Sequence, residues 1–221
     1  MKYPGIADLF AAQPSPESIQ QLGSGAALLP GFVQRRESEL LNEIEQIAAR
    51  SPFRHMITPG GYRMSVAMTN CGALGWVTDL HGYRYDPMDP IAKRTWPEMP
   101  SVFLELAVSA AARAGYESFQ PDACLINRYQ PRSHLSLHQD KDEHDNAAPI
   151  VSVSLGVPAT FLWGGLKRTD RTRRIPLQSG DVVVWGGASR FVYHGIAALA
   201  HHAHPLTGAH RFNLTFRRAG G

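Results

Sequence analysis

The sequence lacks the marks of several protein classes. Only two cysteines, Cys71 and Cys124, occur in 221 residues, and neither belongs to the paired spacing of a zinc site or a disulfide framework. No apolar run reaches the roughly eighteen residues that a membrane-spanning helix needs. The first residues also lack a basic stretch followed by an apolar core. We therefore expect reduced thiols, no membrane span, no secretory signal and a cytoplasmic protein.

The sequence also lacks a strong excess of charge of one sign. Its 22 Lys and Arg residues against 19 Asp and Glu give a formal net charge of +3. This mildly basic balance is compatible with a phosphate-bearing partner but does not require one. A chain of 221 residues with 43% hydrophobic content is long enough to bury the core of one large domain.

Helical periodicity is confined to two segments. From Gln34 to Arg50, apolar residues recur at helical spacing with Glu and Arg between them. A second helix is expected from Ser101 to Ala114, with Ser101 as its N-cap and Gly115 as its stop. Residues 1–33, rich in Pro, Gly, Ser and Ala, are expected to form a loosely ordered lead-in with one strand near Ala26 to Leu29.

Short strand-like segments dominate the remainder of the chain. Between the two helices, glycine punctuates segments dense in Tyr, Trp and Met, which predicts strand-and-turn hairpins. After residue 120, eight short segments with no helix between them predict an antiparallel double sheet of the jelly-roll kind. They are CLINRY, LSLHQD, IVSVSL, TFLWG, RIPL, DVVVWG, FVYH and RFNLTFR. We expect residues 34–118, with the helices and hairpins, and residues 119–221, the jelly-roll core, to form one structural unit.

The stretch LSLHQDKDE, residues 135–143, places polar residues inside a candidate core strand. Side chains alternate along an extended chain, so His138 and Asp140 share one face. His194, followed by a glycine that lets the chain turn, is a candidate third ligand. Two imidazoles and one carboxylate that leave open positions are typical of non-haem Fe(II) oxygenases. On these residues alone, a hydrogen-bonded His138–Asp140 pair with an unrelated His194 is an equal alternative.

The last candidate strand, RFNLTFR, carries two arginines on the face opposite its aromatic residues. Six residues apart in a strand, Arg211 and Arg217 have Cα atoms about 20 Å apart. If both side chains reach inward, they can grip the two ends of a small dicarboxylate. Asn127 and Tyr129, on one face of another strand, supply neutral donors. A solvated arginine face on an edge strand is the alternative that this strand leaves open.

Six motifs follow one another along the second half of the chain: NRY at 127–129, LSLHQDKDE at 135–143, PIVSVSLG at 149–156, GDVVVWGG at 180–187, YHG at 193–195 and RFNLTFR at 211–217. In this order and spacing they resemble the bacterial AlkB family of Fe(II)- and 2-oxoglutarate-dependent nucleic-acid demethylases. The resemblance extends from about residue 50 onward and includes SPFRHMITPGGY and MTNCGALGW. The first thirty or so residues carry none of it.

The resemblance implies a mainly β fold with flanking helices, built on a double-stranded β-helix core, and the use of Fe(II), O2 and 2-oxoglutarate. The implied iron ligands are His138, Asp140 and His194. The implied 2-oxoglutarate-binding residues are Asn127, Tyr129, Arg211, Asn213 and Arg217. Arg211 and Tyr129 would bind the distal carboxylate, and Arg217 and Asn127 would lie near the carboxylate beside the keto group.

The resemblance also implies a pocket for an extruded base. Trp76 would stack on the base and sandwich it against His138, while Asp142 and Glu143 would contact its exocyclic amine. Hairpins within residues 34–118 would form the nucleotide-recognition lid. The implied substrate-binding residues are Trp76, Tyr83, Asp142, Glu143, Arg168, Thr58 and Met68.

The implied reaction is oxidative dealkylation of bases such as 1-methyladenine and 3-methylcytosine in single-stranded or duplex DNA, with RNA left open as a substrate. It consumes O2 and 2-oxoglutarate and releases formaldehyde, succinate and CO2. Methylation at these nitrogens blocks pairing and leaves the base cationic, so extrusion costs less and acids near the pocket become favourable. We expect the protein to act as a monomer.

Two other functions are weighed against this one. A 2-oxoglutarate dioxygenase acting on RNA, protein or a small molecule keeps the same chemistry, whereas a non-catalytic nucleic-acid binding module does not need the co-substrate residues. His201, His202 and His204 are expected to lie in a structural or exposed loop. The run from Lys167 to Arg174 is expected to be a solvated hairpin, with phosphate contact as its alternative.

Overall fold

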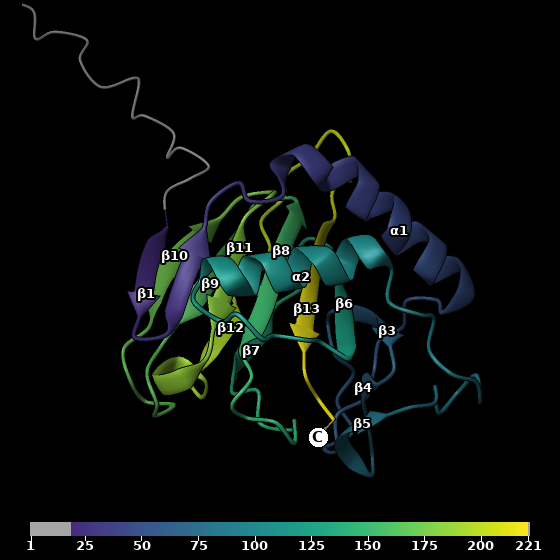
Figure 1. The fold of residues 1–221 in the computed structure, drawn as a ribbon. Helices are drawn as coiled ribbons and strands as arrows, with labels where there is room; N and C mark the ends of the chain where they lie inside the picture. The colour runs from purple at the N-terminus through teal and green to yellow at the C-terminus, as the bar shows by residue number, and fades with distance from the viewer. Residues whose placement is uncertain (1–18, 221) are drawn as a thin grey trace, which may run out of the picture.

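Two antiparallel β-sheets form the body of the protein in the computed structural model, which describes residues 19–220 (Figure 1). The larger sheet has the order β1 (Gln20–Gly23), β2 (Ala26–Leu29), β11 (Val182–Trp185), β8 (Ile150–Gly156), β13 (Arg211–Arg217), β6 (Ala123–Tyr129) and β3 (Ala67–Gly72). The smaller sheet has the order β10 (Arg173–Leu177), β9 (Ala159–Trp163), β12 (His194–Ile196) and β7 (Leu135–His138). A separate hairpin pairs β4 (Gly75–Asp79) with β5 (Gly82–Asp86). The named strands pair antiparallel throughout, as the jelly-roll prediction requires.

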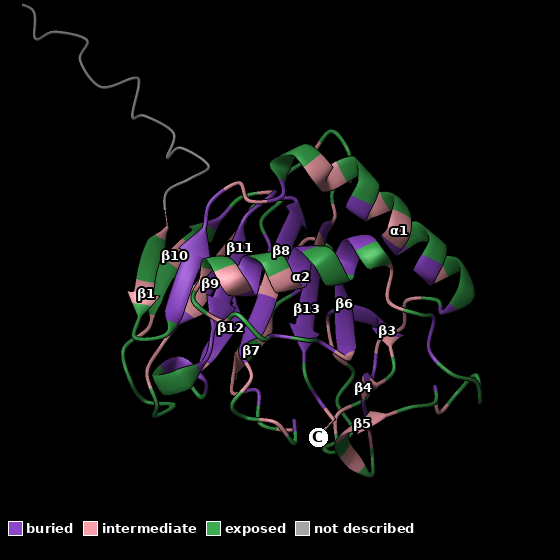
Figure 2. Ribbon diagram, in the orientation of Figure 1, coloured by how far each residue is buried: buried purple, intermediate pink, exposed green. Residues whose placement is uncertain are grey.

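The core has two layers because the central strands of the larger sheet are apolar on both faces. In β11, Val182 and Val184 belong to the cluster that packs against helices α1 (Glu37–Arg50) and α2 (Ser101–Arg113). Val183 and Trp185 belong to the second cluster, which includes residues of both sheets. Strands covered on both faces have near-continuous apolar sequences, which accounts for DVVVWG. Figure 2 shows these buried strands behind α2.

Helix α1 lies over the larger sheet with a buried stripe and a charged outer face. Its buried residues are Leu40, Ile44 and Ile47, and the (i, i+4) and (i, i+3) spacing keeps them on one side. The predicted helix from Gln34 to Arg50 is confirmed from Glu37 onward. Residues Gln34–Arg36 form a short 3₁₀ turn, η1, instead.

The predicted second helix is confirmed over residues 101–113, but its N-cap was assigned wrongly. Ser101 is the first helical residue and Pro100 is the N-cap. The Pro100 carbonyl accepts hydrogen bonds from the amides of Phe103 and Leu104 at 3.0 and 3.1 Å, so the helical bonding begins one residue before the serine. Gly115 has φ of +93°, a left-handed conformation that glycine adopts freely and that ends the helix as expected.

The eight strands predicted after residue 120 are present, with one displaced. Strand β12 begins at His194, the last residue of FVYH, and continues through Ile196. The residues before it follow the 3₁₀ turn η2 (Gly187–Ser189). Tyr193 exchanges backbone hydrogen bonds with the loop that contains Gly164 and Gly165. Its backbone is therefore satisfied outside the regular ladder, which shortens the strand.

The strand predicted near Ala26 to Leu29 is confirmed as β2, but the loosely ordered lead-in around it needs correction. Residues 1–18 lie outside the described residues, but residues 19–33 are not loosely ordered. They contain β1 and β2, and β2 pairs with β11 over its whole length, from Ala26 opposite Trp185 to Leu29 opposite Val182. This pairing extends the larger sheet by a hairpin. Within residues 19–220, no helix is both long and apolar enough to cross a membrane.

Candidate active site

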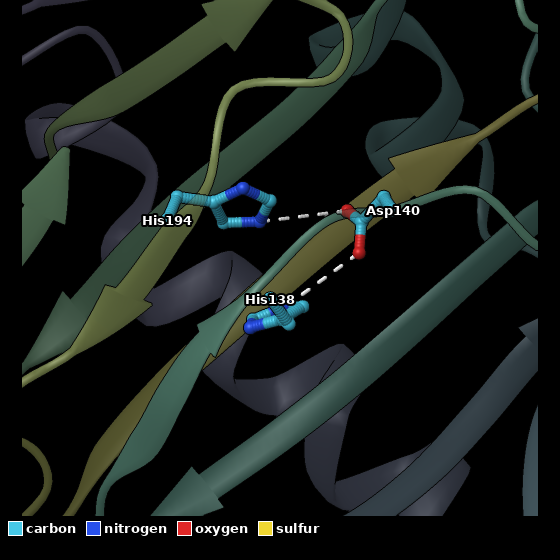
Figure 3. Close-up of side chains that lie close together, drawn as sticks. All are labelled: His138, Asp140 and His194. Carbon is cyan, nitrogen blue, oxygen red and sulfur yellow. Dashed lines mark ion pairs between the residues drawn. The ribbon is translucent and has the colours of Figure 1, made fainter. Parts of the chain in front are cut away.

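The three predicted metal ligands converge where β7 ends and β12 begins. His138 and His194 lie directly opposite each other in the β7–β12 ladder, and Asp140 follows His138 by two residues. Asp140 Oδ1 lies 3.6 Å from Nε2 of His138, and Asp140 Oδ2 lies 3.7 Å from Nε2 of His194 (Figure 3). One ligand atom from each residue falls within 4.8 Å of the others, and the described part of the chain contains no other such group.

Each histidine is oriented by a backbone carbonyl. Nδ1 of His138 lies 2.8 Å from the Ser136 carbonyl oxygen, and Nδ1 of His194 lies 2.9 Å from that of Val192. A ring nitrogen facing a carbonyl oxygen carries the proton and donates it, so Nε2 keeps its lone pair for a metal. Burial lowers the pKa of His194 to about 4 because the charged ring loses hydration. The ring is therefore neutral at pH 7, as a ligand must be.

Asp140 is held as a carboxylate by the arginine beside it. Burial by itself would raise the pKa of this carboxyl, but the Arg217 guanidinium, with smaller contributions from His194 and His138, keeps the pKa well below its usual range. Nη2 and Nε of Arg217 donate to Asp140 Oδ2 at 2.7 and 3.2 Å. Two imidazoles and one carboxylate form a donor set that suits a non-haem Fe(II) ion with open positions.

Arg211 is buried with unused hydrogen-bond donors. Its Nη2 donates to Ser154 Oγ at 3.0 Å, and its guanidinium carbon lies 4.9 Å from the centre of the Tyr129 ring. Nε and Nη1 have no partner among the described residues. Buried polar groups in native proteins are normally paired, so this arrangement fits an anionic ligand. Burial raises the pKa of Tyr129 to about 12, so the phenol is protonated and can donate as well.

The asparagines predicted beside the co-substrate are also buried. Asn213 donates through Nδ2 to Ser152 Oγ at 2.8 Å and to the Val153 carbonyl at 2.9 Å. Its Oδ1 lies 3.4 Å from Nδ2 of Asn127, whose own Oδ1 has no partner among the described residues. Alternation along β13 aims Arg211, Asn213 and Arg217 to the side opposite Leu214 and the helices.

A cavity of about 620 Å³ contains most of the predicted site. Its wall includes the three metal ligands, Asn127, Tyr129, Asn213 and Arg217. Of the predicted substrate residues, it includes Thr58, Met68, Trp76, Tyr83, Asp142 and Arg168. Arg211 is buried behind the wall, where its guanidinium faces the Tyr129 ring.

An aromatic pair on the β4–β5 hairpin forms one side of this cavity. Trp76 and Tyr83 stack with ring centres 5.7 Å apart and planes 21° apart. Trp76 Nε1 donates to Asp142 Oδ2 at 2.9 Å, which brings a carboxylate to the edge of the indole. Asn70 bonds both the amide and the carbonyl of Trp76, each at 3.0 Å. Asn70 therefore orients the tryptophan, a role that no sequence motif indicated.

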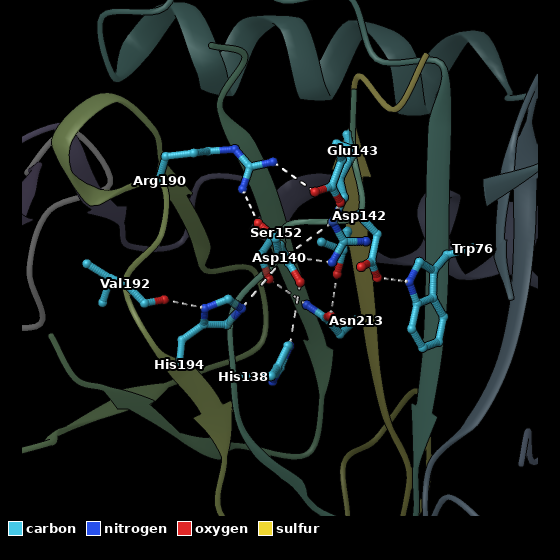
Figure 4. Close-up of polar contacts among 12 residues, drawn as sticks. Trp76, His138, Asp140, Asp142, Glu143, Ser152, Arg190, Val192, His194 and Asn213 are labelled. Carbon is cyan, nitrogen blue, oxygen red and sulfur yellow. Dashed lines mark hydrogen bonds and ion pairs between the residues drawn. The ribbon is translucent and has the colours of Figure 1, made fainter. Parts of the chain in front are cut away.

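Glu143 does not reach this cavity, contrary to the predicted base contact. Its side chain is only 2% exposed and accepts from Tyr85 Oη at 2.7 Å and from Arg190 Nη2 at 3.0 Å. It also lies 3.1 Å from Arg217 Nε. Figure 4 shows Arg190 reaching toward Glu143 and Asp140 from η2. Asp142 lines the cavity, whereas Glu143, in the same irregular loop, turns to the interior and is bonded there.

The histidine cluster, the basic run and the cysteines lie where the sequence predicts. His201 and His202 are exposed in the loop before β13 and join no metal-binding group in the described chain. The run from Lys167 to Arg174 links β9 to β10 as a hairpin with mostly exposed side chains. Cys71 and Cys124 are free and buried, opposite each other in the β3–β6 ladder.

Comparisons with known proteins agree with this geometry. The model of the 2OG-Fe(II) oxygenase superfamily matches residues 25–217. The chain is 58% identical over 214 residues to the alpha-ketoglutarate-dependent dioxygenase AlkB of Escherichia coli K12, covering 96% of this chain and 98% of that protein. It is 37% identical over 209 residues to the AlkB homolog of Caulobacter vibrioides, covering 91% and 93%. The solved structure of OsALKBH1 superposes with a TM-score of 0.78 at 28% identity, covering 91% of this chain and 100% of that one.

Proposed function

Because the chain belongs to the AlkB family of 2-oxoglutarate- and Fe(II)-dependent oxygenases, we propose that it removes alkyl groups oxidatively from N-alkylated bases in nucleic acid. The substrates are bases such as 1-methyladenine and 3-methylcytosine in DNA. The observation that carries this proposal is a single cavity lined by both the His138–Asp140–His194 cluster and the Trp76–Tyr83 aromatic pair.

The residues present fit an iron ion. Three ligand atoms lie close together, one each from His138, Asp140 and His194. Nδ1 of each histidine faces a backbone carbonyl oxygen, and Oδ2 of Asp140 accepts from Arg217. Bound Fe(II) would supply the oxidising chemistry: with O2 and 2-oxoglutarate it hydroxylates the N-alkyl carbon, yielding succinate, CO2 and, from an N-methyl group, formaldehyde and the restored base.

The residues also fit the co-substrate. Arg211 has two buried nitrogens with no partner in the part of the chain that the structure describes, and two parallel N–H donors match one carboxylate. The protonated Tyr129 hydroxyl adds a third donor at the same end. Arg217 lies beside Asp140, near the metal ligands, so we assign it and Asn127 to the carboxylate next to the keto group.

The wall of the cavity suits a flat cationic base. Trp76 presents an aromatic face, and enzymes that extrude bases read them by stacking and by polar contacts. Asp142, bonded to Trp76 Nε1, places a carboxylate where an exocyclic amine of a cationic base can donate to it. Tyr83 stacks on the outer side of Trp76. We assign the β4–β5 hairpin to the nucleotide-recognition lid on these contacts.

Exposed cations near the cavity suit a phosphate backbone. Arg168 lines the cavity rim with its guanidinium 6.0 Å from the Tyr193 ring. Arg171, Arg173 and Arg174 continue the basic run on the exposed β9–β10 hairpin. Sequence-independent contacts of this kind supply much of the affinity for nucleic acid. Free buried thiols suit a reducing compartment, and we propose a cytoplasmic monomer.

The test uses four oligonucleotides of one sequence, each with a single methylated base: single-stranded DNA with 1-methyladenine or 3-methylcytosine, duplex DNA and RNA. The protein is loaded anaerobically with Fe(II), and loss of the methyl mass is followed after O2 and 2-oxoglutarate are added. We expect loss from DNA, and no loss with the His138→Ala variant. Succinate without methyl loss from any oligomer would contradict the nucleic-acid substrate, while methyl loss only from RNA would replace DNA by RNA.

A further inference from the structure

The loop between β7 and β8 carries two residues of the site, yet it has no helix or strand. Residues 139–149 run from Asp140 and Asp142 back to the larger sheet without regular hydrogen bonding. A loop of this kind needs other bonds to hold a ligand in a fixed position. Arg190, from the C-terminal end of η2, supplies them.

Arg190 bonds this loop at three points. Its Nη1 donates to the Asp140 carbonyl at 2.6 Å, and its Nε donates to the Ala148 carbonyl at 3.1 Å. Its Nη2 donates to Glu143 Oε2 at 3.0 Å. The Arg190 and Glu143 side chains are each 2% exposed. The planar guanidinium has all its nitrogens engaged, so it fixes both ends of the loop against one rigid group.

Glu143 extends the same contacts to the lid and to the metal ligand. Tyr85 lies directly opposite Trp76 in the β4–β5 ladder, and its hydroxyl donates to Glu143 Oε1 at 2.7 Å. The same oxygen lies 3.1 Å from Nε of Arg217, whose guanidinium bonds the Asp140 carboxylate. A continuous set of short contacts therefore runs from the lid hairpin to the metal cluster.

We propose that Arg190 and Glu143 are positioning residues: they hold Asp140 in the orientation that the metal requires and tie the lid strand β5 to it through Tyr85. This proposal rests on the proposed function only for its lid half, since metal binding needs no nucleic acid. It also reassigns Glu143 from a base contact to a buried connector.

The first test measures binding of Mn²⁺ alone, a redox-inert probe, by calorimetry. Arg190→Lys keeps the charge but has one nitrogen in place of three, and Glu143→Gln keeps the shape but not the charge. Loss of a partner that orients a ligand weakens metal binding by about 10- to 100-fold, and we expect this range for both variants. Asp145→Asn is the matched control, because Asp145 lies in the same loop and, among the described residues, bonds Ala147, Ala148 and Arg218 but neither Arg190 nor a metal ligand. Wild-type Mn²⁺ affinity in either folded variant would overturn the proposal.

The second test concerns the lid and uses Tyr85→Phe, which removes one oxygen and leaves the packing. We expect Mn²⁺ affinity within twofold of the wild type, but at least a fivefold lower ratio of methyl groups removed to succinate formed. A merely structural role would lower both products together and leave the ratio unchanged, and that result would overturn the lid connection. If the wild type binds Mn²⁺ but demethylates nothing, the proposed function fails while the Mn²⁺ test of Arg190 and Glu143 still stands.

Discussion

One substitution at Arg211 is expected to change stability and co-substrate binding in opposite directions. Arg211→Met keeps an unbranched apolar side chain and removes the guanidinium. Without 2-oxoglutarate, two nitrogens of that guanidinium are buried and have no partner in residues 19–220. An unpaired buried donor costs about 1 to 3 kcal/mol, whereas the one bond to Ser154 contributes about 1 kcal/mol. We therefore expect the free energy of unfolding of Arg211→Met to exceed that of the wild type by about 1 kcal/mol or more, measured by urea denaturation.

The affinity for 2-oxoglutarate should fall in the same variant. Two charge-assisted bonds to a carboxylate are removed, each contributing about 1.5 kcal/mol or more. The sum of about 3 kcal/mol corresponds to roughly a hundredfold increase in Kd. Calorimetric titration of the Mn²⁺-loaded protein with 2-oxoglutarate measures it directly, since Mn²⁺ does not start turnover.

Arg217→Met is the matched control because its guanidinium is paired with Asp140 and Glu143. Its removal leaves the buried Asp140 carboxylate without its arginine partner, which typically costs about 3 to 5 kcal/mol, whereas Glu143 keeps Arg190. The reasoning is refuted if Arg211→Met loses as much stability as Arg217→Met. It is equally refuted if Arg211→Met binds 2-oxoglutarate within threefold of the wild type.

Three further changes test the lid, the basic hairpin and the core. Trp76→Ala should weaken binding of a methylated oligonucleotide by about 1 to 3 kcal/mol because the base no longer stacks on the indole. Succinate formation without nucleic acid should stay intact. Unchanged oligonucleotide binding, measured by fluorescence anisotropy, would exclude the stacking role. Replacing Arg171, Arg173 and Arg174 by Ala should make the slope of log binding constant against log salt shallower by about 0.7 to 0.9 for each phosphate that the variant no longer neutralises; an unchanged slope would leave the run as a solvated hairpin. Ile44→Ala, buried under α1, should lower the free energy of unfolding by about 2 to 5 kcal/mol; a decrease below about 1 kcal/mol in urea denaturation would contradict the packing described.

The alternation of side chains along the strands accounts for most of what could be predicted about which residues face the core and which face the site. In β13 it separated Leu214 and Phe216, which pack under the helices, from Arg211 and Arg217, which face the site. In β11 the apolar run without alternation corresponds to burial on both faces. Such patterns are local, so the sequence contains them in full. The sequence offered His194 only as a candidate ligand, and the resemblance grouped it with His138 and Asp140; its position opposite His138 came from the structure, because a contact across 56 residues has no local signal.

The contacts of Glu143 and Arg190 could not be predicted from the sequence. The acidic pair Asp142 and Glu143 suggested two contacts to one base. The loop that carries them has no regular structure, so its sequence has no periodicity that would separate the two side chains. Nothing in GGASR indicates that Arg190 crosses to the β7–β8 loop, since its partners lie 42 to 50 positions away in sequence. Likewise, the sequence indicated β2 but not β1, which becomes a strand by pairing with β2 at the edge of the larger sheet.

The most direct test of the account is the stoichiometry of one reaction. The iron-loaded protein is given O2, 2-oxoglutarate and single-stranded DNA with one 1-methyladenine, and methyl loss and succinate are measured together, with iron and 2-oxoglutarate omitted in turn. We predict one succinate for each methyl group removed, and neither product when iron or 2-oxoglutarate is absent. Methyl loss without 2-oxoglutarate, or no succinate under any condition, would contradict the assignment of His138, Asp140, His194 and Arg211.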